Sequence, residues 1–139
     1  MAALILVIED VEETRRGIER LLYADNYRVI GAGNEADAIL QARTASPDLV
    51  VMSLGVDSVQ LVAIAQRIRE RAGLSDTVPI VLFCVATLDE GAEVEFAPNL
   101  YLTRPDNFNQ LRRLFNRLLR GPGFSDRYEG ESAAIASIL

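Results

Sequence analysis

The stretch that decides the fold is Pro47-Asp48-Leu49-Val50-Val51-Met52-Ser53-Leu54-Gly55. Its middle is a short, continuous apolar run rich in β-branched residues, bounded by a proline and a glycine. This pattern predicts a strand buried on both faces, in the centre of a parallel sheet. Open α/β sheets bind their ligands beyond the carboxyl ends of the strands, so Ser53 stands at a candidate functional position.

The segments on either side of this strand alternate in the same way. Apolar runs predict four further strands, at residues 4–8, 27–30, 78–85 and 100–103. Helical spacing of apolar residues predicts helices at residues 12–24, 35–45, 58–71 and 107–119. This order predicts an α/β fold: a doubly wound, five-stranded parallel sheet with right-handed crossovers and the flavodoxin-like strand order 2-1-3-4-5.

Residues 88–99 are the least regular part of the pattern. Gly91 and the alternation Val94-Glu95-Phe96 both disfavour a regular helix. The fourth helix is therefore expected to be short or irregular at most.

The composition limits the possible functions. The chain has 139 residues, half of them hydrophobic, which is enough for one domain with a real core. Its net charge of −6 argues against a nucleic-acid-binding surface. The sequence contains neither histidine nor lysine, which excludes histidine general bases, His-ligated metals, Schiff-base lysines and the P-loop lysine.

The ends of the chain and its one cysteine bear on location. Cys84 is the single cysteine, which excludes an internal disulfide and fits a reducing compartment. The N-terminus MAALILVIED has no basic region, and its short apolar run soon meets two acids, so we expect no signal or membrane segment and a cytoplasmic protein. Gly121-Pro122-Gly123 is expected to separate the domain, residues 1–120, from a C-terminal tail, residues 121–139.

In the predicted strand order, four strand ends meet where the order reverses. They carry Glu9 with Asp10, Ser53, Cys84 and Arg104. The segments ILVIED, PDLVVMSL, VPIVLFC and YLTRP, in this order and spacing, resemble the CheY-like receiver domain of two-component response regulators. The resemblance runs from about residue 4 to residue 119, and the set of four is specific although each segment alone is weak.

The resemblance implies a role for each strand end. In that family an acidic pair after the first strand binds Mg²⁺, and Glu9 with Asp10 matches it. An aspartate that accepts the phosphoryl group ends the third strand, where this chain has Ser53. A Ser or Thr ends the fourth strand; Cys84 is the nearest match, with Thr87 close by.

Two further positions lie on and after the fifth strand. The family's lysine before a proline is replaced here by Arg104, which precedes Pro105. The aromatic switch position corresponds to Tyr101. Because the acceptor, hydroxyl and lysine positions are all changed, the resemblance implies an atypical receiver, or pseudo-receiver.

The loss of the aspartate has the greatest chemical weight. An ionised carboxylate is a nucleophile and an oxygen ligand for Mg²⁺, whereas a serine hydroxyl needs a general base and binds the metal poorly. We therefore expect no cofactor, or weakly bound Mg²⁺. Our hypothesis is that the guanidinium of Arg104 pairs with Glu9 or Asp10 and takes the place of metal and phosphate.

The sequence thus predicts a module of phosphorelay signal transduction. We expect no enzymatic activity beyond residual self-phosphorylation. The module is expected to act through contacts with a protein partner, which is a sensor kinase or a downstream effector. Neither nucleic acid nor membrane is an expected partner. A homodimer through the fifth strand and last helix is an open alternative. The expected interaction surface contains Tyr101, Arg112, Arg113 and Arg117.

Two other functions stay open at this stage. One is a phosphorylation-competent, Mg²⁺-dependent receiver that uses Asp57 or Ser53 as acceptor. The other is a pseudo-receiver whose vacated pocket binds a small molecule. Metal dependence distinguishes the first, and a ligand-induced rise in melting temperature distinguishes the second.

Overall fold

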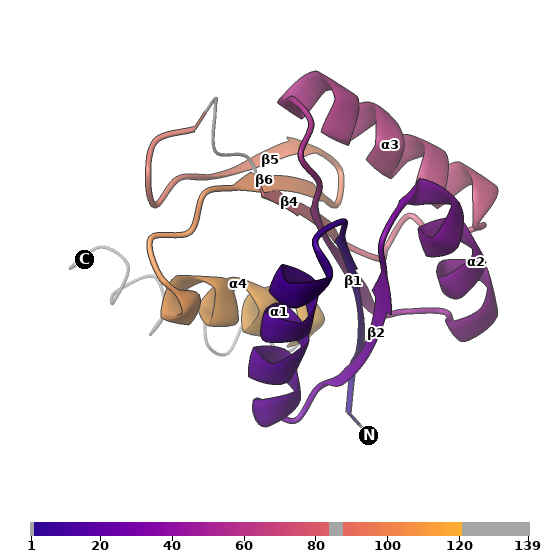
Figure 1. The fold of residues 1–139 in the computed structure, drawn as a ribbon. Coiled ribbons are helices and arrows are strands. Elements are labelled where there is room, and N and C mark those ends of the chain that lie inside the picture. The colour runs from indigo at the N-terminus through magenta and orange to yellow at the C-terminus, as the bar shows by residue number, and fades with distance from the viewer. Residues whose placement is uncertain (1, 84–87, 121–139) are drawn as a thin grey trace. The chain divides into compact units, whose positions relative to one another are not determined.

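The computed structural model describes residues 2–83 and 88–120 (Figure 1). The chain divides between Asp106 and Asn107 into two compact units, with every described strand in the first. The described strands are β1 (Leu4–Glu9), β2 (Arg28–Ala32), β3 (Leu49–Ser53), β4 (Ile80–Phe83), β5 (Glu93–Ala97) and β6 (Leu100–Thr103). The described helices are α1 (Glu12–Ala24), α2 (Glu35–Ala45), α3 (Ser58–Arg71) and α4 (Phe108–Arg120).

The described strands form one six-stranded sheet with the order β2-β1-β3-β4-β6-β5. The first five strands in this order pair in parallel, and β5 pairs with β6 in the antiparallel sense. The predicted fold is confirmed, since β6 takes the place expected for the fifth parallel strand. The sheet has one strand more than the sequence pattern indicated.

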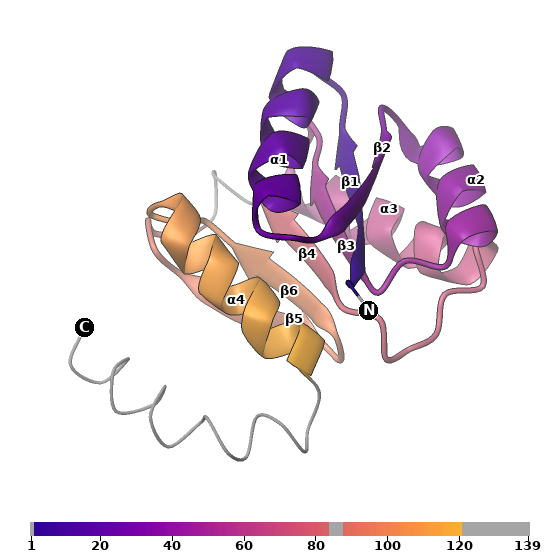
Figure 2. The ribbon, with the colours of Figure 1, turned by 90° about the horizontal axis from the view of Figure 1, so that it is seen from below.

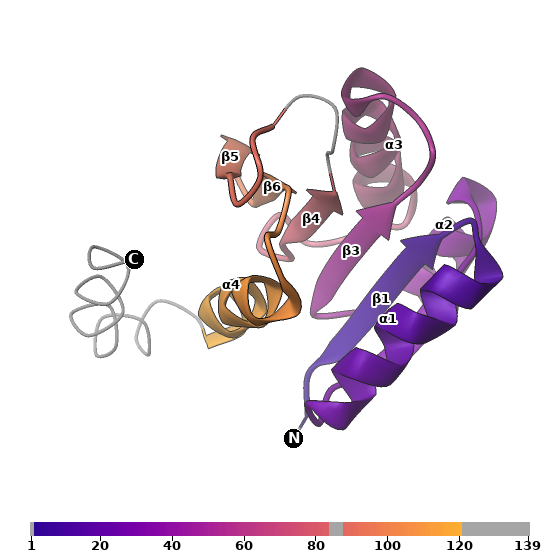
Figure 3. The same cartoon turned by 60° about the vertical axis from the view of Figure 1, so that its left-hand side comes forward.

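Helices of the first unit cover both faces of the sheet. Figure 2 shows β1 and β2 between α1 on one side and α2 on the other. Helix α3 lies on the α2 side, and α2 contacts it directly. Figure 3 shows β1, β3 and β4 running in the same direction, so their carboxyl ends lie along one edge of the sheet.

The core lies between the sheet and the pair α2 and α3. Alternate residues of the central strands point into it, because side chains along a strand alternate between the two faces. The buried cluster includes Leu6, Ile8, Val50, Met52, Ile80 and Leu82 from the strands, and Ala38, Ala42, Leu61, Ala65 and Ile68 from the helices. The small alanines let α2 approach the sheet closely.

Side-chain caps begin α2 and α3. The Asn34 side chain accepts a hydrogen bond from the Asp37 amide at 2.8 Å, which begins α2. The Asp57 side chain accepts one from the Gln60 amide at 2.9 Å, which begins α3. These caps fix where the chain turns from each strand into the following helix.

The expectation of a short helix between residues 88 and 99 is wrong for residues 93–97, which form strand β5. The sequence Glu93-Val94-Glu95-Phe96 alternates with the period of a strand, and residues with positive φ turn the chain at both ends: Gly91 at 86° and Asn99 at 58°. The result is a hairpin with β6, closed by a hydrogen bond from the Arg104 amide to the Ala92 carbonyl at 3.0 Å (Figure 1).

Helix α4 forms the described part of the second unit. The Asn107 side chain caps it by accepting a hydrogen bond from the Gln110 amide at 3.0 Å. Within the helix, the Arg112 guanidinium lies over the Phe108 ring, 5.0 Å from its centre. No helix among residues 2–83 and 88–120 is long and apolar enough to cross a membrane.

Candidate functional site

The site is built on the adjacent carboxyl ends of β1 and β3. The parallel register of these strands places Glu9 opposite Ser53, the last residue of each strand. Glu9 is buried, with 5% of its surface exposed, whereas the following Asp10 is exposed. The sheet therefore brings together three of the residues singled out from the sequence.

The Glu9 carboxylate is held from several sides. One of its oxygens, Oε2, accepts a hydrogen bond from the Val11 amide at 3.0 Å. Burial raises the pKa of Glu9 above its ordinary value, and the nearby Asp10 carboxyl raises it further; hydrogen bonds from Val11 and the Ser53 hydroxyl oppose this rise in the pKa. These surroundings therefore disfavour the ionised form of Glu9.

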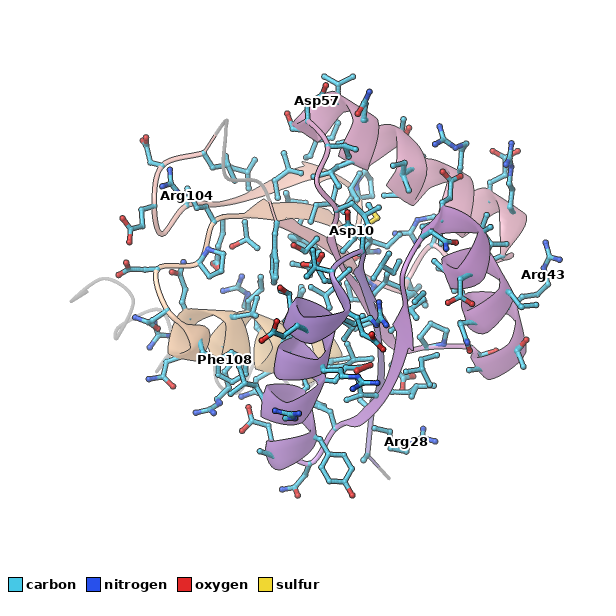
Figure 4. The ribbon with its side chains drawn as sticks, in the orientation of Figure 1. Asp10, Arg28, Arg43, Asp57, Arg104 and Phe108 are labelled. Carbon is cyan, nitrogen blue, oxygen red and sulfur yellow. The ribbon has the colours of Figure 1, made fainter. Side chains whose placement is uncertain are left out.

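The turn after β3 lies beside Asp10. A Cβ added at Gly55 would lie 3.8 Å from the Asp10 Oδ2 atom, so this turn lies close to the exposed carboxylate. Asp57 follows in the same turn, and its carboxylate caps α3 (Figure 4). The glycine thus leaves room beside Asp10, while Asp57 is engaged with the helix.

Arg15 is a site residue that the sequence analysis missed. Its Nη1 atom donates a hydrogen bond to the Glu9 backbone carbonyl at 2.9 Å. A Cβ at Gly33 would come within 3.2 Å of the same nitrogen, so the glycine makes space for the guanidinium. The Gly31-Ala32-Gly33 segment was the available signal, because such glycines favour close approach by another group.

Arg104 does not reach the acidic pair. Its Nη1 atom donates a hydrogen bond to the Leu88 carbonyl at 3.1 Å, and Figure 4 shows it well away from Asp10. Among the described residues, the predicted ion pair with Glu9 or Asp10 is not formed. The guanidinium instead binds Leu88, while the backbone of Arg104 bonds to Gly91 and Ala92 just before β5.

Arg104 lies near two acidic side chains, Glu90 and Asp106. A hydrogen bond with the Asp106 side chain, and the charge of that group, raise the pKa of Glu90, while Arg104 lowers it. Arg104 thus lies close enough to this exposed acidic pair to favour the ionised form of Glu90.

The remaining candidate residues lie elsewhere. Cys84 and Thr87 fall outside the described residues. Tyr101, half-buried on β6, pairs with Val81 of β4 on one side and Glu95 of β5 on the other. On α4, Arg113 and Arg117 are exposed, and Arg112 is partly exposed.

The described residues do not fit a full Mg²⁺ site. Such sites use carboxylate oxygens, and the strand ends supply the two carboxylates of Glu9 and Asp10 together with the Ser53 hydroxyl. No group of three His, Cys, Asp or Glu side chains suitable for a metal occurs in residues 2–83 and 88–120. Replacing a third carboxylate by a hydroxyl lowers the negative charge available to a divalent cation.

Comparison with known proteins identifies relatives of this arrangement. A family model described as the response regulator receiver domain matches residues 5–116. The chain is 26% identical over 124 residues to the KDP operon transcriptional regulatory protein KdpE of Escherichia coli strain K12, a match covering 84% of this chain and 51% of KdpE. The chain therefore spans about half the length of this relative.

Solved structures share the fold. The response regulator protein TrrA of Thermotoga maritima, solved in complex with Mg²⁺ and BeF, superposes with a TM-score of 0.66 at 22% identity, covering 86% of this chain and 100% of TrrA. The complex of histidine kinase ThkA with TrrA gives a TM-score of 0.65 at 20% identity, covering 86% and 99% of the two chains. These likenesses concern the fold alone.

Proposed function

The chain belongs to the response regulator receiver domain family, and from this premise we propose that it acts in two-component signalling without aspartyl phosphorylation, through contacts with other proteins. Receivers are signalling domains rather than a catalytic enzyme family. The pseudo-receiver assignment, the absence of a resident metal and a cytoplasmic location are parts of the same proposal.

The observation that carries the proposal is the residue at the end of β3. Ser53 lies opposite Glu9, at the position where the family's phosphoacceptor aspartate is expected. Its hydroxyl engages the Glu9 carboxyl, whose raised pKa reflects burial beside Asp10. A hydroxyl in this position is a poor nucleophile toward a phosphoryl group unless a base removes its proton, and it supplies no third carboxylate for Mg²⁺.

A displaced acceptor at Asp57 is disfavoured by its contacts. The Asp57 carboxylate accepts the Gln60 amide hydrogen bond that caps α3, and it lies four residues after the end of β3. Phosphorylation there would remove a cap, which contributes about 1 kcal/mol to helix stability. Asp57 therefore has a structural role that explains its presence.

A small-molecule function has some support from a surface hollow, although not at the strand ends. An open cavity of about 540 Å³ lies beside α1 and β2 and is lined by Arg16, Glu19, Arg20, Tyr23, Ala24 and Val29. None of these residues belongs to the Glu9, Asp10 and Ser53 cluster. The hollow is therefore separate from the altered strand ends.

The partner class follows from the family. The ThkA–TrrA complex pairs a receiver with a histidine kinase, and we propose a sensor kinase or a downstream effector as the partner here. Tyr101 and the arginines Arg112, Arg113 and Arg117 remain the proposed interaction residues. A homodimer through the face of the fifth parallel strand, β6, and the last helix, α4, stays an alternative.

The test is intact mass spectrometry after incubation with Mg²⁺ and a small-molecule phosphodonor. We expect the natural chain to gain no phosphoryl group and the Ser53→Asp variant to gain one. Ser53→Asn is the matched control, because it is isosteric with Asp but lacks the nucleophilic carboxylate. Phosphorylation of the natural chain would refute the proposal, and mapping it to Asp57 or Ser53 would establish the phosphorylation-competent alternative.

A further inference from the structure

The β5 strand ends the described sheet and leaves one of its long sides toward solvent. It pairs only with β6 in the strand order, and the residues Glu93, Val94, Glu95 and Phe96 are all exposed. A terminal strand of this kind is a template for pairing with another extended chain. Which extended chain could pair with β5 depends on the direction of its free backbone groups and on the kind of side chains along it.

The hydrogen-bond pattern of the hairpin orients the backbone of β5. The Arg104 amide bonds to the Ala92 carbonyl, and the register then pairs Glu93 with Thr103 and Val94 with Leu102. Because bonded and non-bonded pairs alternate in an antiparallel ladder, the N–H and C=O groups of Glu95 point away from β6. The outer side of the strand thus presents backbone groups in the geometry that another strand uses.

The side chains of β5 alternate in kind between its two faces. Val94 lies on the face of its partner Leu102 and is 44% exposed, while Glu93 and Glu95 lie on the opposite face. A register shift between Glu95 and Ala97 interrupts the pairing at Phe96, which is 57% exposed. An incoming strand would therefore meet acids on one face and apolar side chains near the other.

Charge decides among the extended chains that this edge can accept. In a second copy paired antiparallel about Val94, Glu93 of one copy would face Glu95 of the other, and like charges placed directly opposite destabilise a sheet. The chain's own segment 121–132 has Asp126, Glu129 and Glu131 against the one cation Arg127, so its net charge is also negative. Acids preceding the strand, Asp89 and Glu90, extend the negative edge.

We propose that β5 is a docking edge for an extended partner segment in which basic and apolar residues alternate. The partner's backbone would continue the sheet beyond β5. Its basic side chains would lie beside Glu93 and Glu95, and its apolar side chains beside Val94. Opposite charges across such a pair of strands are stabilising, so the pattern selects its partner by charge as well as by shape.

A synthetic hexapeptide that alternates arginine with valine is the probe, and a peptide with three arginines followed by three valines is its composition-matched control. Binding is followed by NMR in the full chain, together with hydrogen exchange of the backbone amides. We expect the alternating peptide to protect the Glu95 amide and to bind at least tenfold more tightly than the block peptide. Amides of β2, the other terminal strand, are the internal reference.

Charge reversal supplies the second arm. Glu93→Lys with Glu95→Lys is expected to weaken binding of the alternating peptide roughly tenfold or more. Glu13→Lys with Glu70→Lys changes the net charge equally on exposed helix positions and should leave binding unchanged. The double variant Glu93→Gln with Glu95→Gln removes both charges without reversing them, so it should lose an intermediate amount of affinity for the alternating peptide. Its amide spectrum checks that the variant is folded.

Three results would overturn the proposal. Equal binding of both peptides would show attraction by charge alone, and equal binding by the two charge-reversed chains would place the site elsewhere. Protection of the Glu95 amide that rises with protein concentration in the absence of peptide would show that the edge pairs with a second copy.

Discussion

Strands β3 and β5 have the same length of five residues and opposite surroundings. In β3, four successive residues are buried and the fifth, Ser53, emerges at the candidate site; in β5, four successive residues are exposed. A continuous apolar run requires cover on both faces, and the parallel centre of the sheet provides it. An alternating run with acids requires water on one side, and the antiparallel edge provides that.

The difference separates two ways of changing a receiver. At β3 the strand of the parallel sheet is kept, and our proposal concerns only the residue at its end, Ser53. Residues 93–97 instead form an additional strand, where the sequence pattern led us to expect at most a short or irregular helix. The first change acts on chemistry, and the second acts on the surface available to partners.

The largest expected effect comes from truncating the centre. Leu6→Ala, at a fully buried position of β1, should lower the free energy of unfolding by about 2 to 5 kcal/mol. Val94→Ala on the half-exposed edge should cost about 1 kcal/mol or less. Urea unfolding of both variants measures this contrast; similar costs would mean that β5 belongs to the core.

A smaller effect is expected at the hairpin turn. Asn99 has a φ of 58°. Its side-chain amide donates a hydrogen bond to the Asp76 carbonyl at 2.7 Å, and its backbone amide donates one to the Glu95 carboxylate at 3.1 Å. Asn99→Ala should lower the free energy of unfolding by about 1 to 2 kcal/mol, because alanine is strained at this positive φ and cannot form the hydrogen bond to Asp76. Asn99→Gly keeps the conformation at less strain and should cost less. The reverse order in thermal unfolding would contradict this account of the turn.

The pH dependence of stability tests the pocket and should be smaller still. Because the folded-state pKa of Glu9 lies above its ordinary 4.5, the folded chain binds this proton more tightly than the unfolded chain. The associated stability is complete below pH 4.5 and is lost as the pH rises through the raised pKa. Glu9→Gln should therefore remove this decline, measured by denaturant unfolding without divalent metal.

Glu35 provides the contrast for that titration. Two hydrogen bonds of 2.7 Å from Arg67 lower its pKa, so its contribution is present above pH 4.5 and is lost as the pH falls through the lowered pKa. Glu35→Gln should thus flatten the acid side of the profile and leave the decline at higher pH. If Glu9→Gln changed the acid side instead, the burial argument for Glu9 would be wrong.

Much of the fold was predictable because local pattern and burial agree along most of the chain. The run Leu49–Met52 indicated a central strand, and helical spacing indicated helices at residues 35–45 and 58–71, as found. The alternation at Val94-Glu95-Phe96 was noticed, but only as an argument against a regular helix. Whether such a short run pairs with a neighbour depends on the turn at Asn99, whose positive φ is not fixed by residue type alone.

The site was predictable in part. Strand order and register brought Glu9 and Ser53 together as expected, because both residues end neighbouring strands. The direction of the Arg104 side chain was not predictable, since it depends on the carbonyl of Leu88 in a segment whose conformation was misjudged. The contact of Arg15 with the Glu9 backbone likewise depends on how α1 lies over Gly33.

The most direct test of the central claim is the melting temperature of the natural chain and of Ser53→Asp with Mg²⁺ and beryllofluoride, a mimic of the phosphoryl group. A ligand present at 100 times its dissociation constant stabilises the folded state by about 2.7 kcal/mol. The account predicts no shift for the natural chain and a rise of several degrees for Ser53→Asp. An equal rise in the natural chain would contradict it, because the pocket would then bind metal and phosphoryl mimic without the aspartate.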